Sequence, residues 1–335
     1  MRFLLTTDPG LEDIALDEAR ERWPSAQAPA DPLPMSGRLV VELPDDVDPC
    51  ALRTVHHVTE LRLAGHAASL DDVRAAVARA EIPELAHAAS FRASTTRVGE
   101  HPFSSQQIAG AAGAVLQRRY GTPVDLEGFE INVRVDLIGD ELLVGIQRTR
   151  ESLARRIRRA RPLRTSLKPT IAAAMVRLAR CHRGARSLLD PMCGTGTIPI
   201  EAREANPELL VAASDWDEET VATARATIAR HGLEIEVRRL DVREAAAGWG
   251  RRFDAVVTDP PYGLRQGRRV RLGALYTFVL RGCLDALADD GRLVVICPRR
   301  KAFEGAVRRL PLTVVHERVV ETGGLFPRIW VLERR

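Results

Sequence analysis

The feature that most constrains this chain is a strict alternation of apolar strands and helices from residue 167 onward. The strands are predicted in "RSLLD", "LVAASD", "IEVRRLD", "FDAVVTDP" and "GRLVVICP", and a predicted helix separates each from the next. Near-continuous apolar strands of this kind are typical of a parallel sheet that is covered by helices on both faces. Residues 312–334 add two strands joined by "TGGLFP". That connection is too short for a helical crossover, so we expect these two strands to pair antiparallel.

The N-terminal half has a different pattern. Predicted strands in "RFLLTT", "GRLVVEL" and "LRLAGHA" alternate with helices expected to begin near Pro9, Pro49 and Asp71. A further helix over 104–120 has Ser104 as its expected N-cap. Two alternating segments around "IGDE" predict a hairpin. Without long βαβ spacing, this half favours a small α+β fold.

Charge is distributed unevenly along the chain. Residues 1–147 carry 13 arginines against 23 acidic residues, a net of −10, whereas residues 148–335 carry 36 basic against 22 acidic residues, a net of +14. The segment 148–164, "RTRESLARRIRRARPLR", contains eight arginines and a single acid. Such a run is either a solvated helical face or a contact for a polyanion, most commonly a nucleic acid. We predict phosphate contacts from Arg155, Arg156, Arg158 and Arg159.

Cysteine usage and hydropathy narrow the class of protein. The five cysteines lie far apart, without a CxxC or Cys/His cluster, which argues against a zinc site or a disulfide framework. No apolar run approaches the roughly 20 residues of a membrane span. The start "MRFLLTTDPG" reaches an acidic residue too early for a signal peptide. We expect a cytoplasmic monomer that binds no metal and no membrane.

A glycine turn follows the first strand of the alternating region, in "LLDPMCGTGTIPIEA" (188–202). Gly194 and Gly196 allow the backbone to approach a ligand closely, and the start of the next helix favours an anionic group. A nicotinamide-binding turn would need a small residue three places after the second glycine, where this chain has Pro199. The turn therefore fits a dinucleotide poorly.

Acidic residues end the next two strands. Asp215 lies 19 residues after Gly196 and is placed to accept hydrogen bonds from two ribose hydroxyls. Trp216 either packs on a purine face or belongs to the core. Asp241 either accepts from an exocyclic adenine amine, beside the Val242 N–H, or caps a helix. Because ligands of such sheets bind beyond the carboxyl ends of the strands, the three sites support one another.

The fourth strand ends in "TDPPYG" (258–263), and with it the chain resembles the class I S-adenosylmethionine-dependent methyltransferases that methylate amino groups. The resemblance covers residues 167–335 and implies a Rossmann-like sheet with S-adenosylmethionine as cofactor. It implies donor contacts from Asp190, Met192, Gly194, Thr195, Gly196, Thr197, Asp215, Trp216, Asp241, Val242 and Asp259, with Thr170 near the methionine end. The alternative for "DPPYG" is a surface turn.

The same resemblance gives "DPPY" a chemical role. A ring-conjugated exocyclic amine is a poor nucleophile, and two acceptors that hold its hydrogens free its lone pair. Asp259 would offer its carboxylate and Pro260 its carbonyl. Both prolines fix the backbone before the substrate arrives. Tyr262 would stack on the base, a contact worth about 1–3 kcal/mol.

The region "FRASTTRVGEHPFSSQQIAGAAGAVLQRRYGTPVDL" is similar to a THUMP RNA-binding domain preceded by a ferredoxin-like unit. Together the two resemblances indicate the enzymes that form N2-methylguanosine in tRNA, most closely the bacterial TrmN family, which acts on guanosine 6 of the acceptor stem. They divide the chain into a ferredoxin-like domain (1–60), a THUMP domain (61–150), an arginine-rich linker (151–166) and a methyltransferase domain (167–335).

This resemblance also implies where RNA binds. The partner would be the acceptor stem and 3′ end of tRNA, contacted by Arg92, Arg97 and His101 of the THUMP region, by the linker arginines, and by Arg265, Arg268 and Arg269. The alternatives are guanosine 10 of tRNA, 23S rRNA as the substrate of a guanine-N2 methyltransferase, and an RNA-binding protein without catalysis. The target base would have to be flipped out of the stem.

Overall fold

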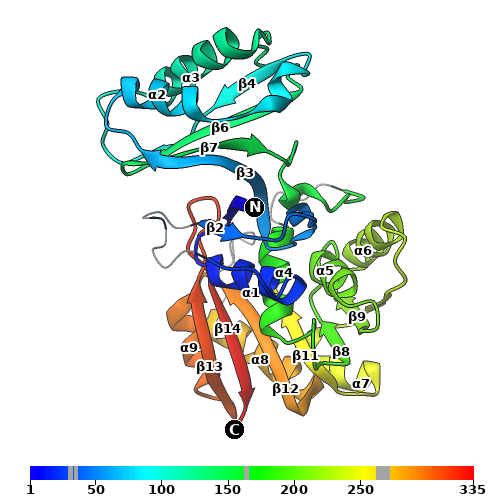
Figure 1. The fold of residues 1–335 in the computed structure, drawn as a ribbon. Helices are drawn as coiled ribbons and strands as arrows, with labels where there is room; N and C mark the ends of the chain where they lie inside the picture. The colour runs from blue at the N-terminus through cyan, green and yellow to red at the C-terminus, as the bar shows by residue number, and fades with distance from the viewer. Residues whose placement is uncertain (29–32, 34–36, 162–165, 262–271) are drawn as a thin grey trace. The chain divides into compact units, whose positions relative to one another are not determined.

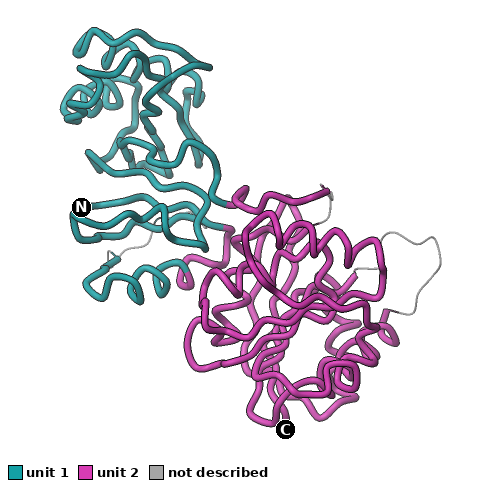
Figure 2. Tube along the Cα trace, turned by 90° about the vertical axis from the view of Figure 1, so that its right-hand side faces the viewer, with its two compact units in different colours: residues 1–7, 15–153 teal, residues 8–14, 154–335 magenta. Residues whose placement is uncertain are grey.

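The computed structural model describes residues 1–335 except 29–32, 34–36, 162–165 and 262–271. The chain divides into two compact units (Figure 2). Unit 1 consists of residues 1–7 and 15–153, and unit 2 of residues 8–14 and 154–335. In the part of the chain that the structure describes, no helix combines the length and the apolar character that crossing a membrane requires.

Unit 1 is built on one 7-stranded sheet. Its strands are β1 (Arg2–Thr7), β2 (Arg38–Glu42), β3 (Val55–His66), β4 (Phe91–Ser94), β5 (Arg97–Val98), β6 (Ile131–Ile138) and β7 (Glu141–Gln147). Across the sheet the order is β2-β1-β3-β7-β6-β4, and β5 also pairs with β6. Strands β4 and β5 run parallel to β6, whereas the other neighbours are antiparallel.

The long strand β3 holds this sheet together. It pairs with β1 over 55–60 and with β7 over 59–66. A Cβ at Gly145 of β7 would lie 2.2 Å from the Glu60 carbonyl oxygen, so glycine is what lets the two strands approach. The boundary that we placed at residue 60 falls inside this strand.

Helices α2 (Leu70–Arg79) and α3 (Ser105–Tyr120) cover one face of the β7-β6-β4 part of the sheet (Figure 1). They bury a cluster that includes Phe91, Ile108 and Val133. The Ser104 side chain accepts from the Gln107 N–H at 3.2 Å, which confirms the predicted N-cap. The predicted hairpin is also confirmed, because β6 and β7 pair antiparallel.

One helix of the N-terminal half was predicted wrongly. The segment after Asp48 forms only the 3-10 turn η1 (Pro49–Ala51), capped where Asp48 accepts from the Cys50 N–H at 2.9 Å. The chain then enters β3 at Val55, and strand pairing with β1 leaves no room for a longer helix. The helix expected near Pro9 is α1 (Glu12–Arg22), and a second 3-10 turn, η2, spans Pro83–Ala86.

Unit 2 contains a second 7-stranded sheet in the order β10-β9-β8-β11-β12-β14-β13. Its strands are β8 (Ser187–Asp190), β9 (Leu210–Asp215), β10 (Glu236–Arg239), β11 (Phe253–Thr258), β12 (Leu287–Cys297), β13 (Leu312–Val319) and β14 (Arg328–Arg334). The helices are α4 (Pro169–Leu178), α5 (Thr197–Ala205), α6 (Glu218–Arg230), α7 (Ala245–Trp249), α8 (Leu272–Ala286) and α9 (Arg300–Val307), with 3-10 turns η3 (Leu153–Arg155) and η4 (Val242–Glu244). The predicted parallel run and its antiparallel C-terminal hairpin are both confirmed.

Helices cover both faces of this sheet, as the apolar strands predict. Alternate residues of β11 point to opposite sides: Val256 packs in a cluster with α8 and α9, whereas Ala255 and Val257 pack in a cluster with α4 and α5. In the first cluster Phe303 stacks on Trp330 with ring centroids 5.2 Å apart. The sheet is therefore the middle layer of three.

The short segment 8–14 packs within unit 2, although it precedes most of unit 1 in sequence. Leu11 and Ile14 are buried in the same cluster as α4. Arg318 of β13 donates to the Gly10 carbonyl at 2.8 Å, and Gly10 has φ +93°. A Cβ at Gly10 would lie 2.2 Å from the Val319 carbonyl oxygen, so this contact needs glycine. Nothing in the sequence pattern indicated this arrangement.

Candidate active site

Strand order in unit 2 reverses between β8 and β11, which both run parallel to each other in the middle of the sheet. In open α/β sheets the ligand crevice lies beyond the carboxyl ends of the strands at such a reversal. Asp190 ends β8, Asp215 ends β9, and Asp241 and Asp259 follow β10 and β11. The sheet therefore brings the four predicted carboxylates to one edge.

The turn after β8 is held by the end of β9. The Cys193 N–H donates to the Ser214 carbonyl at 2.9 Å, and the Gly194 N–H donates to Asp215 Oδ2 at 3.2 Å. Gly194 and Gly196 have φ of +53° and +88°, a region that favours glycine. A Cβ at Gly194 would meet nothing within 4 Å. Backbone conformation explains that glycine, and the open space beside it can admit a ligand.

Asp190 lies beneath this turn and is almost fully buried. Its Oδ1 accepts from the Met192 N–H at 3.2 Å. Burial raises the pKa of Asp190 well above its ordinary value, and the negative charges of Asp215 and Asp259 raise it further. The carboxyl group is thus suited to hold the turn and to accept or donate a hydrogen bond at its rim.

Asp215 connects the turn with the start of α6. Its Oδ1 accepts from the Asp217 N–H at 3.2 Å, opposite the bond from Gly194. Burial raises its pKa also. Because a carboxylate has about four acceptor positions, these bonds leave acceptor capacity for a ligand. The next side chain, Trp216, is 65% exposed and so is not part of the core.

Asp241 caps the 3-10 turn η4, so the helix cap that the sequence left open as an alternative to an adenine contact is present. It accepts from the Arg243 N–H at 2.9 Å at the start of η4 and pairs with the Arg243 guanidinium at 2.7 Å. The hydrogen bond and charge of Arg243 lower the pKa of Asp241. This carboxylate stays ionised, and Val242 follows it at the same strand end.

Asp259 and Pro260 continue β11 beyond Thr258, and Pro260 is buried. Pairing of β11 with β8 places Val256 opposite Leu189, so Asp259 comes two residues beyond the level of Asp190. Tyr262 and the predicted RNA contacts Arg265, Arg268 and Arg269 lie outside the described residues.

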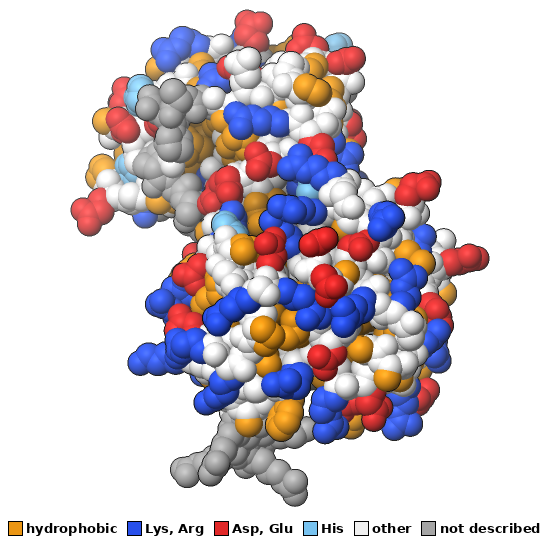
Figure 3. Space-filling view, turned by 90° about the horizontal axis from the view of Figure 1, so that it is seen from below, with side chains coloured by type: hydrophobic (Ala, Val, Ile, Leu, Met, Phe, Trp, Pro, Cys, Tyr) orange, Lys and Arg blue, Asp and Glu red, His pale blue; other side chains and the backbone are white. Residues whose placement is uncertain are grey.

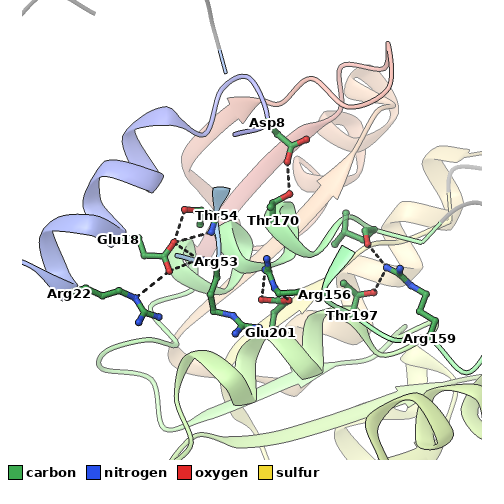
Figure 4. A network of polar contacts seen from close by, with 11 residues as sticks. Asp8, Glu18, Arg22, Arg53, Thr54, Arg156, Arg159, Thr170, Thr197 and Glu201 are labelled. Atoms are coloured by element: carbon green, nitrogen blue, oxygen red, sulfur yellow. Dashed lines mark hydrogen bonds and ion pairs between the residues drawn. The ribbon is translucent and has the colours of Figure 1, made fainter. Parts of the chain in front are cut away.

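Thr170 is fully buried at the start of α4. Its hydroxyl donates to Asp8 Oδ2 at 2.6 Å (Figure 4). Lys168 donates to Asp8 Oδ1 at 2.7 Å. The Thr170 side chain, which we expected near the methionine end of the donor, thus uses its hydroxyl hydrogen in a bond to Asp8. Sequence reasoning missed Asp8, since 162 residues separate it from Thr170 and no motif marks it.

The four linker arginines do not share one environment. Arg155 and Arg158 are exposed. Arg156 forms a two-pronged pair with the fully buried Glu201, through Nε at 2.9 Å and Nη2 at 2.8 Å. Arg159 Nη2 donates to the Leu167 carbonyl at 3.1 Å and to Thr197 Oγ1 at 3.3 Å (Figure 4). Only the first two present their charge to solvent, as phosphate contacts require.

The THUMP-region residues lie on or near β4 and β5 of unit 1. Arg92 Nε donates to Asn132 Oδ1 at 3.2 Å, and its guanidinium lies 3.9 Å from the centre of the Phe129 ring. Arg97 donates to the Gly99 carbonyl at 3.2 Å, and His101 stacks near Phe103. Across the described residues these three side chains have no acidic partner, so their donors are suited to an acidic ligand.

In the described part of the chain, two polar atoms near the glycine turn are buried without a hydrogen-bond partner. They are Arg159 Nε and Ser214 Oγ. Such groups are costly unless a ligand or water satisfies them. Together with the space above Gly194, they fit a polar organic ligand.

Within the described ranges no three His, Cys, Asp or Glu side chains are grouped as metal ligands would be. On the face drawn in Figure 3, basic side chains are interspersed with acidic ones rather than gathered in one patch.

Comparison with known proteins identifies two domains. Residues 156–328 match the family model of the RMKL-like methyltransferase domain, and residues 67–147 match that of the THUMP domain.

Relatives of known activity extend over nearly the whole chain. A protein of Thermus thermophilus named tRNA (guanine(6)-N2)-methyltransferase is 39% identical over 98% of both chains. One of the same name from Archaeoglobus fulgidus is 30% identical over 99% of this chain and 92% of its own. The crystal structure of TrmN from Thermus thermophilus superimposes with a TM-score of 0.86, at 37% identity, covering 100% of this chain and 99% of that one.

Proposed function

This chain belongs to the family of proteins that join a THUMP domain to an RMKL-like methyltransferase domain, and we propose that it forms N2-methylguanosine at position 6 of tRNA. The observation that carries the proposal is the position of Asp259 and Pro260 beside Asp190, at the reversal of strand order. The full-length similarity to two guanine(6)-N2 methyltransferases supports the choice of substrate.

The donor would be S-adenosylmethionine, which supplies an electrophilic methyl group on a cationic sulfur. The glycine turn and its flanking residues (Asp190, Met192, Gly194, Thr195, Gly196 and Thr197) would hold the amino-acid end. Asp215 would accept from the ribose hydroxyls, Trp216 would cover the adenine, and Asp241 with the Val242 N–H would read the adenine edge. The raised pKa of Asp215, caused by burial, is consistent with a carboxylate that gains hydrogen bonds when a ligand binds.

The acceptor amine would be held by two groups of the chain. Asp259 would accept one N2 hydrogen and the Pro260 carbonyl the other, so that the nitrogen would be drawn toward tetrahedral geometry and its lone pair would be less delocalised into the ring. S-adenosylmethionine would supply the methyl group to that lone pair, with the sulfur keeping the electron pair of the broken bond. The proton that the nitrogen gives up would pass to Asp259 or water. Because these acceptors are placed by a strand end, little reorganisation is needed during the reaction. Tyr262 would stack on the base.

Guanosine 6 lies within a stem, so it would have to be extruded, at a cost of a few kcal/mol. Phosphate contacts from the exposed Arg155 and Arg158, and from Arg265, Arg268 and Arg269, would offset that cost. Each duplex phosphate contact would add about −0.9 to the slope of log affinity against log salt. Arg92, Arg97 and His101 of the THUMP domain would contact the 3′ end.

The test is mass-spectrometric mapping of methyl groups on unmodified tRNA incubated with the protein and S-adenosylmethionine. A methyl group on N2 of guanosine 6 is the expected result. A methyl group on N2 of guanosine 10 would keep the chemistry and overturn the position. Donor binding without any methylated tRNA would overturn the substrate and direct the search to ribosomal RNA.

A further inference from the structure

Arg159 is a half-buried cation without an acidic partner. Its Nη2 reaches two neutral oxygens, the Leu167 carbonyl and Thr197 Oγ1, while its Nε is excluded from solvent and makes no hydrogen bond. Nowhere in the described part of the chain does a carboxylate pair with it. Arg156, three residues earlier, differs because its Nε and Nη2 both donate to the carboxylate of Glu201. The two inward arginines of the linker are therefore not equivalent.

The position of Arg159 connects it with the donor turn. Thr197 is the first residue of α5, and the helix has Gly196 as its N-cap, without a side-chain hydrogen bond to its first N–H groups. The start of a helix carries a partial positive charge. On the other side, Ser166 Oγ lies 3.4 Å from Thr195 Oγ1 of the same turn. A cation, a helix start and two hydroxyls thus surround one end of the turn.

Burial makes this arrangement costly without an anion. Desolvation lowers the pKa of Arg159, but a guanidinium remains protonated at any physiological pH. A buried charge is normally paired. Glu201 of α5 is already bonded to Arg156. Among the described residues, no carboxylate neutralises Arg159.

We propose that Arg159 binds the carboxylate of the amino-acid end of the methyl donor, and does not contact an RNA phosphate. The inference rests on the proposed function, because it needs S-adenosylmethionine in the crevice beyond β8. The carboxylate is the only anionic group of that molecule. A guanidinium has five N–H donors; Nη2 uses its two on Leu167 and Thr197, so Nε and Nη1 retain donors for carboxylate oxygens. Exposed Arg158 remains a phosphate contact.

The experiment compares two ligands that differ in the carboxylate alone. Binding of S-adenosylmethionine and of decarboxylated S-adenosylmethionine is measured by calorimetry on the full chain without RNA, for the wild type, Arg159→Gln and Arg159→Lys. Arg158→Gln is the matched control. Wild type and Arg158→Gln should prefer the carboxylated ligand. Arg159→Gln should lose roughly 10- to 100-fold in affinity for it and change little for the decarboxylated ligand. Arg159→Lys should keep part of the preference.

Three results would overturn the inference. Equal weakening of both ligands by Arg159→Gln would mean that the residue only shapes the turn. Unchanged donor affinity, with a lower tRNA affinity and a shallower salt slope, would return Arg159 to the RNA-binding group. If the wild type prefers the carboxylated donor but methylates no guanosine 6, the proposed function fails and the inference stands. Failure of the wild type to bind either ligand would overturn both.

Discussion

At the scale of single residues, the environment drives the pKa values of the strand-end carboxylates apart. Burial raises those of Asp190 and Asp215, whereas Arg243 lowers that of Asp241. The same edge thus contains buried carboxyl groups that hold the glycine turn and an ionised carboxylate at Asp241. In the proposed function Asp259 has the remaining role, as an acceptor for the substrate amine.

Replacing Asp259 by alanine should abolish methyl transfer while donor binding survives. The change removes one of two acceptors that are aligned with the reacting amine, and loss of one such group costs roughly 10²–10³ in kcat. Single-turnover methylation of tRNA measures the rate, and calorimetry with S-adenosylhomocysteine measures donor binding. Asp290→Ala, at an exposed position of unit 2, is the control. Full turnover by Asp259→Ala would refute the assigned chemistry.

The raised pKa of Asp190 predicts how the free energy of unfolding depends on pH. Because its pKa is raised in the folded state, the folded chain binds a proton at pH values where the unfolded chain has released it. The contribution of Asp190 to the unfolding free energy therefore improves as the pH falls from neutral through that interval. Asp190→Asn removes this dependence, so wild type should gain relative to the variant on acidification. Denaturant titrations at neutral and mildly acidic pH, followed by tryptophan fluorescence, measure the difference.

Asp13 of unit 2 provides a control of opposite sign. The hydrogen bond from Arg318 lowers the pKa of Asp13, so its contribution is lost as the pH falls through the lowered value. Wild type should therefore lose stability relative to Asp13→Asn under the same acidification. Equal pH dependence of the two variants would contradict both assignments.

At the scale of elements, a glycine on α8 sets the distance between this helix and η4. A Cβ at Gly282 would lie 2.2 Å from the Val242 carbonyl oxygen, and backbone cannot move aside as a flexible side chain can. Val242 belongs to the proposed adenine edge. Packing of one helix thus fixes a part of the donor site that lies on a different element.

Gly282→Ala should destabilise unit 2 by about 1–3 kcal/mol and weaken the binding of S-adenosylhomocysteine, because α8 and η4 must separate. Gly273→Ala on the same helix is the matched control. A Cβ there would approach only Arg309 Nη1, at 3.8 Å, so the change should be neutral or stabilise by up to about 1 kcal/mol. Denaturation and calorimetry on both variants test this. Unaltered ligand affinity in Gly282→Ala would mean that the packing of α8 does not shape the proposed donor site.

The elements of unit 2 could be predicted because their signals are local. Apolar strands, the glycine turn and the C-terminal hairpin each lie within a short window of sequence. Side-chain direction is not local: a count of arginines cannot tell that Arg156 and Arg159 turn inward while Arg155 and Arg158 face solvent. The helix expected from Pro49 failed for a related reason, since pairing of β3 with β1 overrides the local preference there.

At the scale of the whole molecule, the two units divide the N-terminal residues between them. Leu5 is buried in a cluster with β2 and β3 of unit 1, and Leu11 is buried in the cluster of α4 in unit 2. Contacts between residues so far apart in sequence leave no periodic signal. This is why the link from Asp8 to Thr170 was not predicted.

Leu11→Ala should destabilise unit 2, and Leu5→Ala should destabilise unit 1, each by about 2–5 kcal/mol. Hydrogen exchange read by mass spectrometry distinguishes the two. The first variant should lose protection in α4 and β14, and the second in β1 and β3. If both variants loosened the same unit, the assignment of residues 8–14 to unit 2 would be wrong.

The place of residues 8–14 has a consequence for how the protein is made. During synthesis these residues leave the ribosome early, but Arg318 and Val319, which hold Gly10, follow more than 300 residues later. Domains usually fold in turn as they emerge, and contacts of long sequence separation form late. Here unit 2 cannot be completed until translation has passed β13. A polypeptide released before that point would lack the residues of β13 that contact Gly10. Methyltransferase activity would therefore appear only in chains translated past that strand.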